Sequence, residues 1–280
     1  MSDTVTLPDG RTVPALGQGT WFLGETPSRR ADELAALRTG LDLGLTLIDT
    51  AEMYGEGAAE ELVGEAVAGH RDDVVLVSKV YPWNADAHGT VEACRASLRR
   101  LGTDRLDLYL LHWRGGVPLA ETAAALDALV RAGDVLGWGV SNLDVDDLLE
   151  LDGVAGGLGS ACQTDQVLYN LSRRGPEHDL LPFLRERGVA TMAYSPVEQG
   201  RILGDPALRK VARRHGATPA QVALAWVLAG EGVVAIPRSA SAEHVRENAA
   251  ARDLRLGAED LAELDAAFPP PRGPAPLEML

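Results

Sequence analysis

The chain of 280 residues has very few cysteines and no long apolar run. Its two cysteines, Cys94 and Cys162, are not in a CxxC or Cys/His spacing that would hold a metal ion. A disulfide is not expected in a reducing compartment, so we interpret both as structural thiols. No uninterrupted apolar stretch is long enough to cross a bilayer. The first ten residues have neither the basic nor the apolar region of a secretory signal, so we expect a cytoplasmic protein. From the cysteine spacing we expect no metal site.

Positive charge is also scarce, and lysine almost absent. Lysine and arginine together number 26 against 41 acidic residues, which gives a formal net charge of −15. Because such a chain repels polyanions, nucleic acid and anionic membrane surfaces are excluded as partners. A small anionic ligand would need a local basic pocket. The only lysines are Lys79 and Lys210, so each of them requires an explanation.

Short β-branched or leucine-rich runs alternate along the chain with segments of helical spacing. Residues Val91, Cys94, Leu98 and Leu101, for example, recur at three- and four-residue intervals and form one apolar helix face. Strand followed by helix, about eight times in this length, predicts a (β/α)₈ TIM barrel. The predicted strands are 15–19, 45–49, 74–79, 106–112, 136–141, 162–167, 189–194 and 232–237. The predicted helices are 28–44, 58–69, 90–102, 119–133, 144–153, 178–188 and 218–230.

The two ends of the chain differ from this repeating pattern. Residues 1–15 predict a β-hairpin that turns at Asp9 and Gly10, a pair typical of a type I′ turn. Residues 269–280 form a proline-rich tail. No linker divides the chain before that tail, so we interpret residues 1–280 as one domain.

The alternative architecture is a doubly wound open sheet. It would be favoured by a G-x-G-x-x-G turn after an early strand, where a dinucleotide binds. Gly17 and Gly19 begin such a turn, but Phe22 stands where the third glycine belongs. The barrel is therefore the preferred prediction.

Polar side chains end the predicted strands, and in a barrel all of these ends lie on the rim that carries catalysis. Taken singly, each could be a cap or a solvated loop residue. Lys79 is harder to explain in this way, because its ammonium is a compact charge with a movable pKa, unlike the guanidinium used almost everywhere else. The strand-end residues are Asp49, Lys79, His112, Ser141, Asn142, Gln166, Tyr194, Ser195, Pro237 and Arg238.

Several motifs occur together in the order of a known family. They are GLTLIDTAEMYGEGAAEELVG, LVSK, LDLYLLHW, GWGVSN, QVLYN, AYSP and IPRS followed by VREN. The chain resembles the aldo-keto reductases from the hairpin to Asn248, and it looks most similar to small bacterial members of the methylglyoxal-reductase type. The resemblance implies a (β/α)₈ barrel whose bottom is closed by a hairpin, and NAD(P)H-dependent carbonyl reduction without a metal or flavin.

By this resemblance, four residues are catalytic: Asp49, Tyr54, Lys79 and His112. Tyr54 matches the family's proton donor, yet a free phenol with a pKa of about 10 is a poor acid near neutrality. We expect the Lys79 ammonium to lower that pKa, with Asp49 holding the lysine in place. His112 is expected to donate a hydrogen bond to the substrate oxygen and to orient the carbonyl.

The resemblance also implies a site for NADPH, with NADH as the alternative cofactor. The nicotinamide carboxamide is expected to bond Ser141, Asn142 and Gln166, and the ring to stack on Tyr194. Helix capping is the alternative for Ser141 and Asn142, since both residue types favour N-caps. The residues implied to bind the cofactor are Gly19, Thr20, Trp21, Asp49, Ser141, Asn142, Gln166, Tyr194, Ser195, Pro196, Val197, Arg238, Ser239, His244 and Asn248.

The adenosine end of the cofactor is expected to meet the segment 236–248. Arg238 stands where the family commonly has lysine, and an arginine can bind a phosphate through two hydrogen bonds. His244 stands where the family has arginine, which removes a permanent charge. We therefore expect a preference for NADPH and leave its strength open. Asn248 matches the family's adenine contact, with an ordinary place on an exposed helix face as the alternative.

The substrate pocket is expected to have aromatic walls, formed by Trp21, Trp83 and Trp113. Barrel packing is the alternative for Trp83. The predicted substrates are small aldehydes, α-keto aldehydes such as methylglyoxal, and activated ketones. A regulatory or sensor subunit that binds NADPH with little turnover is the alternative function, and a monomer is expected. The tail at 269–280 either covers the pocket mouth or is disordered.

Overall fold

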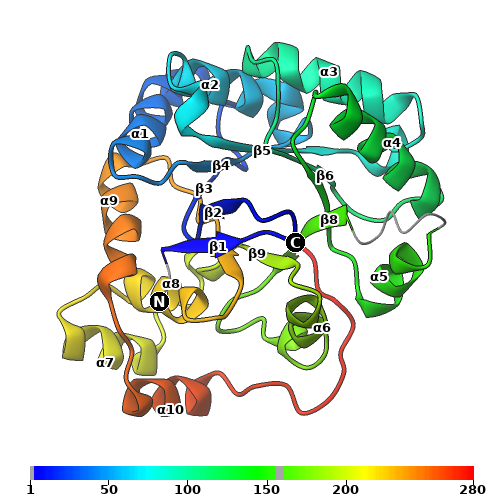
Figure 1. Ribbon diagram of the computed structural model, residues 1–280. Helices are drawn as coiled ribbons and strands as arrows, with labels where there is room; N and C mark the ends of the chain where they lie inside the picture. The colour runs from blue at the N-terminus through cyan, green and yellow to red at the C-terminus, as the bar shows by residue number, and fades with distance from the viewer. Residues whose placement is uncertain (1–2, 155–160) are drawn as a thin grey trace.

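Eight parallel strands form the centre of the protein (Figure 1). The computed structural model describes residues 3–154 and 161–280. Their order in the sheet is β10-β9-β8-β7-β6-β5-β4-β3. The two outer strands also meet, because Leu16 pairs with Ala235 and Gly19 with Arg238 in parallel bridges. The predicted barrel is confirmed, and the open-sheet alternative is wrong. The strands are β3 (Gln18–Gly19), β4 (Leu47–Asp49), β5 (Val75–Val80), β6 (Leu108–Leu111), β7 (Trp138–Ser141), β8 (Cys162–Leu168), β9 (Ala190–Tyr194) and β10 (Val233–Ala235).

The two glycines of the incomplete G-x-G-x-x-G pattern lie where the barrel closes. A Cβ atom on Gly19 would come within 2.8 Å of the carbonyl oxygen of Ile236, and one on Gly17 within 2.6 Å of Leu47 Cδ2. The main-chain N–H of Gly17 donates to the carbonyl of Ala235 at 2.9 Å. Glycine is needed at both positions because the backbones approach too closely for a side chain.

The N-terminal hairpin pairs β1 (Thr4–Thr6) with β2 (Thr12–Pro14), as predicted, but its turn differs from the prediction. The N–H of Gly10 donates to the carbonyl of Leu7, so the central turn residues are Pro8 and Asp9. Gly10 has a φ of +85°, whereas neither central residue has a positive φ. The type I′ prediction is therefore wrong, because that turn needs a positive φ at both central residues.

Contacts to the strands show which end of the barrel the hairpin covers (Figure 1). The N–H of Asp9 donates to Gln163 Oε1 near the start of β8, and Arg11 Nη1 donates to the carbonyl of Asp107 just before β6. Both acceptors lie at the N-terminal ends of parallel strands. The hairpin therefore closes the bottom, and the opposite rim remains available for a site.

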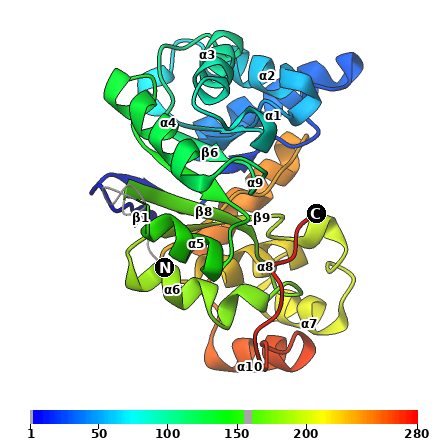
Figure 2. The ribbon, with the colours of Figure 1, turned by 90° about the vertical axis from the view of Figure 1, so that its right-hand side faces the viewer.

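Helices surround the barrel (Figures 1 and 2). All seven predicted helices are present, whereas α7, α9 and α10 were not predicted. Lys210 on α7 forms an exposed ion pair with Glu263 on α10 at 2.8 Å, which accounts for one of the two lysines. The helices are α1 (Arg30–Asp42), α2 (Ala58–Val67), α3 (Gly89–Leu101), α4 (Leu119–Ala132), α5 (Val145–Asp152), α6 (Leu180–Glu186), α7 (Pro206–His215), α8 (Pro219–Leu228), α9 (Ala242–Ala250) and α10 (Ala258–Ala267).

One large apolar cluster extends from Val5 to Leu264 and fills the layers between strands and helices. The interpretation of residues 1–280 as one domain stays a prediction. Cys94 and Cys162 are free thiols buried within the cluster, and burial raises the pKa of each to about 12. Among the described residues, no helix is both long and apolar enough to span a membrane.

Candidate active site

A buried lysine lies on the C-terminal rim of the barrel. Lys79 is on β5 and exposes none of its surface. Its Nζ donates to Asp49 Oδ2 at 2.8 Å, to the carbonyl of Thr50 at 2.8 Å, and to the Tyr54 hydroxyl at 3.1 Å. An ammonium has three hydrogens, and here each has an acceptor. A planar guanidinium would not fit this compact arrangement, which explains the lysine in a chain that otherwise prefers arginine.

Tyr54 begins the 3₁₀ helix η2 (Tyr54–Gly57), in the loop that follows β4. The predicted lowering of its pKa is wrong. Burial raises the pKa of Tyr54 well above its usual value, and the negative charge of Asp49 raises it further. The positive charge of Lys79 is paired with Asp49 and does not outweigh these two effects in the resting protein. Tyr54 therefore keeps its proton at neutral pH.

His112 follows β6, and its side chain points toward the same place. Burial, and then the charge of Lys79, lower the pKa of His112 to about 2, so the imidazole is neutral. Its ring lies 5.7 Å from that of Tyr54, measured between centroids, at an interplanar angle of 76°. The Nδ1 atom is buried and has no hydrogen-bond partner within residues 3–154 and 161–280. A buried polar atom without a partner suggests a ligand contact or a functional constraint.

Gln166, on β8, fixes the second oxygen of Asp49. Its Nε2 donates to Asp49 Oδ1 at 2.7 Å and contacts Met192 Sδ at 2.9 Å. Both carboxylate oxygens of Asp49 are therefore hydrogen-bonded. The side-chain amide nitrogen of Gln166 is engaged within the protein. Its Oε1 is therefore the atom that would accept a hydrogen bond from the amide of a ligand.

Ser141, Asn142 and Tyr194 form a connected set at the ends of β7 and β9. The Tyr194 hydroxyl donates to Asn142 Oδ1 at 3.0 Å, and Asn142 Nδ2 donates to Ser141 Oγ at 3.0 Å. Ser141 Oγ in turn donates to the carbonyl of Gln166 at 2.8 Å. The capping alternative is wrong, because the N-cap of α5 is Asp144.

These residues surround a cavity of about 670 Å³ at the rim. Lys79 lies beneath its floor and does not line it. The predicted site residues that line the cavity are Gly19, Thr20, Trp21, Asp49, Tyr54, His112, Trp113, Ser141, Asn142, Gln166, Tyr194, Ser195, Pro196, Val197, Arg238 and His244. Lining residues that the sequence did not predict include Phe22, Met53, Gln199, Leu203, Met279 and Leu280.

Some of the missed residues had a signal in the sequence and others had none. Phe22 and Met53 are direct neighbours of predicted residues, so extending each motif by one position would have found them. Met279 and Leu280 are remote from every motif. They lie here because the C-terminal segment returns to the rim, which answers the question of whether the tail reaches the cavity.

Besides Lys79, three predicted site residues do not line the cavity. Trp83 is 64% exposed, stacks on Tyr81 with ring centroids 4.2 Å apart, and meets Trp113 edge-on at 5.8 Å. The barrel-packing alternative for Trp83 is therefore wrong, and its contact with substrate stays a prediction. Ser239 bonds the main chain of Ser241. Asn248 is buried on α9, so the exposed-face alternative for it is wrong.

Arg238 and His244 both line the cavity, and the sequence predicts that Arg238 meets a phosphate of the cofactor. The Arg238 guanidinium makes one long hydrogen bond, from Nη2 to the carbonyl of Phe22 at 3.5 Å. Burial and the nearby positive charge of Arg29 lower the pKa of Arg238. Because its printed hydrogen bond is long, the Arg238 guanidinium still has donors for an anion such as a phosphate.

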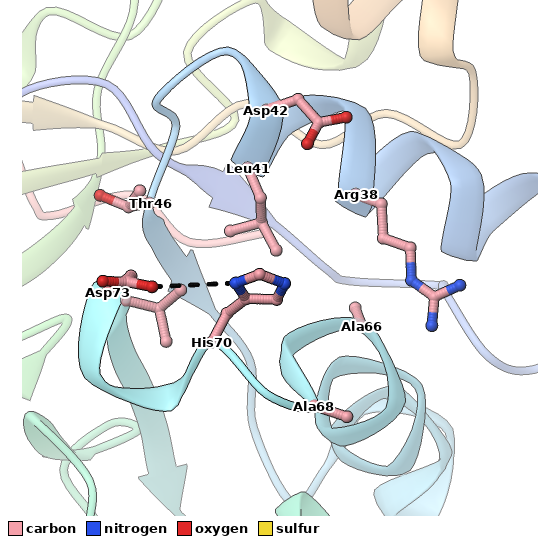
Figure 3. Close-up of a pocket in the computed structure, with 9 residues that line it drawn as sticks. Arg38, Leu41, Asp42, Thr46, Ala66, Ala68, His70 and Asp73 are labelled. Atoms are coloured by element: carbon pink, nitrogen blue, oxygen red, sulfur yellow. Dashed lines mark ion pairs between the residues drawn. The ribbon is translucent and has the colours of Figure 1, made fainter.

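A second hollow of about 500 Å³ lies between α1 and α2, toward the bottom of the barrel (Figure 3). Its side chains do not converge on one point. His70 Nδ1 lies 3.8 Å from Asp73 Oδ2, and Arg38 donates to the carbonyl of Glu65. Among the described residues, no group of three His, Cys, Asp or Glu could hold a metal ion. This hollow offers no arrangement for catalysis.

Comparisons with known proteins agree with the geometry of the rim. Residues 15–268 match the model of the Aldo/keto reductase family. The chain belongs to this family. It is 51% identical to Methylglyoxal reductase YeaE of Escherichia coli (strain K12), over 96% of each protein. It is 34% identical to Glyoxal reductase of Bacillus subtilis (strain 168), over 100% of this chain and 98% of the relative.

A solved structure of this family has almost the same fold. An aldo/keto reductase from Klebsiella pneumoniae, crystallised in complex with NADP and acetate, has 50% sequence identity and a TM-score of 0.97, and the match covers 100% of both chains. The resemblance read from the sequence is thus confirmed. This aldo/keto reductase is an NAD(P)H-dependent oxidoreductase.

Proposed function

We propose that this aldo/keto reductase uses NADPH to reduce small aldehydes, α-keto aldehydes such as methylglyoxal, and activated ketones to alcohols. The observation that carries the proposal is the contact of Lys79 with both Asp49 and Tyr54, directly beneath a cavity at the catalytic rim. The names of the E. coli and B. subtilis relatives support a dicarbonyl substrate.

The cavity residues fit a nicotinamide dinucleotide phosphate. Ser141, Asn142 and Gln166 would hold the amide end, where polar atoms are grouped at the strand ends. Arg238 would hold a phosphate at the opposite end, where its guanidinium is only weakly engaged within the protein. When bound there, the cofactor supplies the hydride that reduces the carbonyl carbon.

Tyr54 donates the proton in this proposal. As negative charge develops on the carbonyl oxygen, the neutral phenol transfers its proton to that oxygen. The resulting phenolate lies 3.1 Å from the Lys79 ammonium, which stabilises it more than it stabilises the neutral phenol. Asp49 keeps the lysine charged and oriented for this step. Lys79 thus acts after proton transfer begins, and the high pKa of the resting phenol keeps the proton in place beforehand.

His112 orients the carbonyl. Because its imidazole is neutral, one ring nitrogen carries a hydrogen and the other does not. The ring can therefore donate one hydrogen bond to the carbonyl oxygen without competing with Tyr54 to release a proton. Fixing the oxygen between the two side chains places the carbonyl carbon for hydride attack.

The walls of the cavity favour compact carbonyl compounds. Trp21, Trp113 and Met53 contribute apolar surface beside Tyr54 and His112. Tyr54 and His112, the polar groups at the reacting position, are uncharged, so a small carbonyl with an activated carbon fits better than a highly charged substrate.

The sensor alternative has no specific observation in its favour. A protein that only senses its cofactor would not need a buried ion pair that bonds a phenol on the cavity floor. We further propose that the protein acts in the cytoplasm and as a monomer, in keeping with its acidic surface charge and its predicted small-molecule substrate.

The variant Tyr54→Phe tests the proposal. It removes the proton donor and keeps the ring, so we expect reduction of methylglyoxal by NADPH to slow by about 10²- to 10⁴-fold. NADPH binding, followed by its fluorescence, should stay within about threefold of the parent, because the ring is retained. Reduction by Tyr54→Phe at the parent rate would rule out this assignment. An inactive parent protein that binds NADPH tightly would favour the sensor instead.

A further inference from the structure

The loop after β9 forms one wall of the cavity in an unfavourable backbone conformation. Ser195, Glu198 and Gln199 have φ values of +47°, +50° and +53°. A residue other than glycine rarely adopts such values, because its Cβ crowds the main chain. Three such residues within five positions need contacts that hold the loop, and these contacts must come from outside the cavity that it lines.

Glu198 supplies these contacts from the outer side of the loop. It is 3% exposed and does not line the cavity. Its Oε2 accepts from Asn170 Nδ2 at 2.8 Å, and its Oε1 accepts from Arg201 Nη2 at 2.7 Å and from Arg173 Nη2 at 3.1 Å. Asn170 also donates to the carbonyl of Ser195 at 3.0 Å, so both ends of the loop are held.

Arg173 has a second partner, in the C-terminal segment. Its Nη1 donates to Glu278 Oε1 at 2.6 Å, while Nε and Nη2 face Glu198. Glu278 is followed directly by Met279 and Leu280, which line the cavity. In both ribbon views the C-terminal segment runs from α10 and ends near β9 (Figures 1 and 2).

We propose that Arg173 is a positioning residue that sets two walls of the cavity together, the β9 loop through Glu198 and the C-terminal segment through Glu278. The planar guanidinium presents donors along two edges, so one side chain can bind two carboxylates at once. A lysine at this position has one nitrogen, whereas Arg173 uses Nε and Nη2 for Glu198 and Nη1 for Glu278, so a lysine cannot reproduce both contacts in their present geometry.

The arrangement links two parts of the proposed reaction. Ser195 and Val197 lie on the wall that we assign to the cofactor, whereas Met279 and Leu280 lie on the wall formed by the tail. Loss of Arg173 should therefore weaken both cofactor and substrate binding. Because Arg173 does not line the cavity, the rate of the bound complex should change little.

The test compares Arg173→Met, Glu278→Ala and the double variant. Main-chain amide hydrogen exchange is followed for residues 195–203 and 277–280, and KM and kcat are measured with methylglyoxal and NADPH. We expect Arg173→Met to speed exchange in both segments. Glu278→Ala should speed exchange in 277–280 alone. Each increase should be about two- to fivefold, which corresponds to the free energy of a partly exposed ion pair. The double variant should exchange like Arg173→Met, because both changes break the same contact to the tail.

The kinetic part rests on the proposed function, and the exchange part does not. With Arg173→Met we expect the KM values for both NADPH and carbonyl to rise about two- to fivefold, with kcat within about twofold of the parent. Arg173→Lys should restore slow exchange in only one of the two segments. If the parent shows no reductase activity, the proposed function fails, while the exchange results still decide the role of Arg173.

Two matched variants serve as controls. Arg187→Met breaks an ion pair away from the cavity, in which Arg187 Nε lies 2.8 Å from Asp152 Oδ2. The Arg187 side chain is 36% exposed, close to the 34% of Arg173. Glu65→Ala breaks the similarly exposed pair with Arg30. Neither should alter exchange in 195–203 or 277–280. Unchanged exchange in either segment with Arg173→Met, or the same changes with Arg187→Met, would overturn the proposal.

Discussion

The Nζ atom of Lys79 lies 2.8 Å from Asp49 Oδ2, with 0% of the lysine side chain and 3% of the aspartate side chain exposed. Burial lowers the pKa of Lys79 and raises that of Asp49, and the charge of each group opposes the shift of the other. The pair thus holds one ammonium at a fixed point beneath the cavity. The Tyr54 hydroxyl, which would become the phenolate, lies 3.1 Å from this ammonium.

Lys79→Met tests the value of this charge. The methionine fills similar space without a charge, so we expect kcat for methylglyoxal reduction to fall by at least about 10²-fold, since the phenolate loses its stabilising partner. The variant should also lose about 3 to 5 kcal/mol in the free energy of unfolding, because Asp49 is left unpaired. Denaturant unfolding and steady-state kinetics measure the two effects.

The double variant Asp49→Asn with Lys79→Met separates stability from catalysis. Removing the second charge should recover much of the lost stability, because no unpaired charge remains buried, while kcat stays low. Recovery of activity together with stability would show that Lys79 acts through folding alone.

The pH dependence of stability should reveal the buried His112. Its pKa is about 2 in the folded protein against an ordinary value of 6.5, so between these values the unfolded chain binds a proton that the folded protein does not. The contribution of His112 to stability is therefore present above pH 6.5 and is lost as the pH falls toward 2, by up to about 1.4 kcal/mol per pH unit.

The matched variant for this measurement is His112→Gln, which cannot gain the proton. Urea unfolding from pH 4 to 8 measures the free energy of unfolding of both proteins. As the pH falls below 6.5, the parent should lose stability relative to His112→Gln. A difference that does not change with pH would contradict a neutral buried imidazole.

The barrel could be predicted because each strand is short, apolar and followed by a helical segment. The ends of those strands then identified Asp49, Lys79 and His112 without any three-dimensional information. The turn at Asp9 was mistaken because the preceding Pro8, whose fixed φ suits the first central position, sets the turn one residue earlier. Local sequence contained both signals, and the proline was decisive.

Other features depended on contacts that no local pattern records. The pKa of Tyr54 depends on its depth and on the neutralisation of Lys79 by Asp49, and both are known only once the barrel is closed. The place of Leu280 depends on where the tail runs after α10. Composition alone described that tail as proline-rich, whereas its ion pair between Glu278 and Arg173 joins residues 105 positions apart.

Gly19→Ala should weaken the closure of the barrel. The added Cβ would meet the carbonyl oxygen of Ile236 at 2.8 Å, and this is a main-chain atom rather than the end of a flexible side chain. We expect a loss of about 1 to 3 kcal/mol in the free energy of unfolding, the usual cost of overpacking. Gly116→Ala is the control, because a Cβ there meets nothing within 4 Å, and its stability should match the parent. Equal effects of the two changes would contradict this account of the closure.

Arg238 and His244 together should set the choice between NADPH and NADH. Arg238→Ala removes the permanent cation at the phosphate end of the cavity, so we expect Kd for NADPH to rise by roughly 10- to 100-fold, as for a lost hydrogen bond between charged groups, and Kd for NADH to change little. His244→Arg adds a cation beside the same place and should tighten NADPH binding alone. Fluorescence titration of both cofactors at fixed ionic strength measures the ratio, because salt weakens such contacts. A ratio of NADPH to NADH affinity that stays the same in both variants would place the phosphate elsewhere.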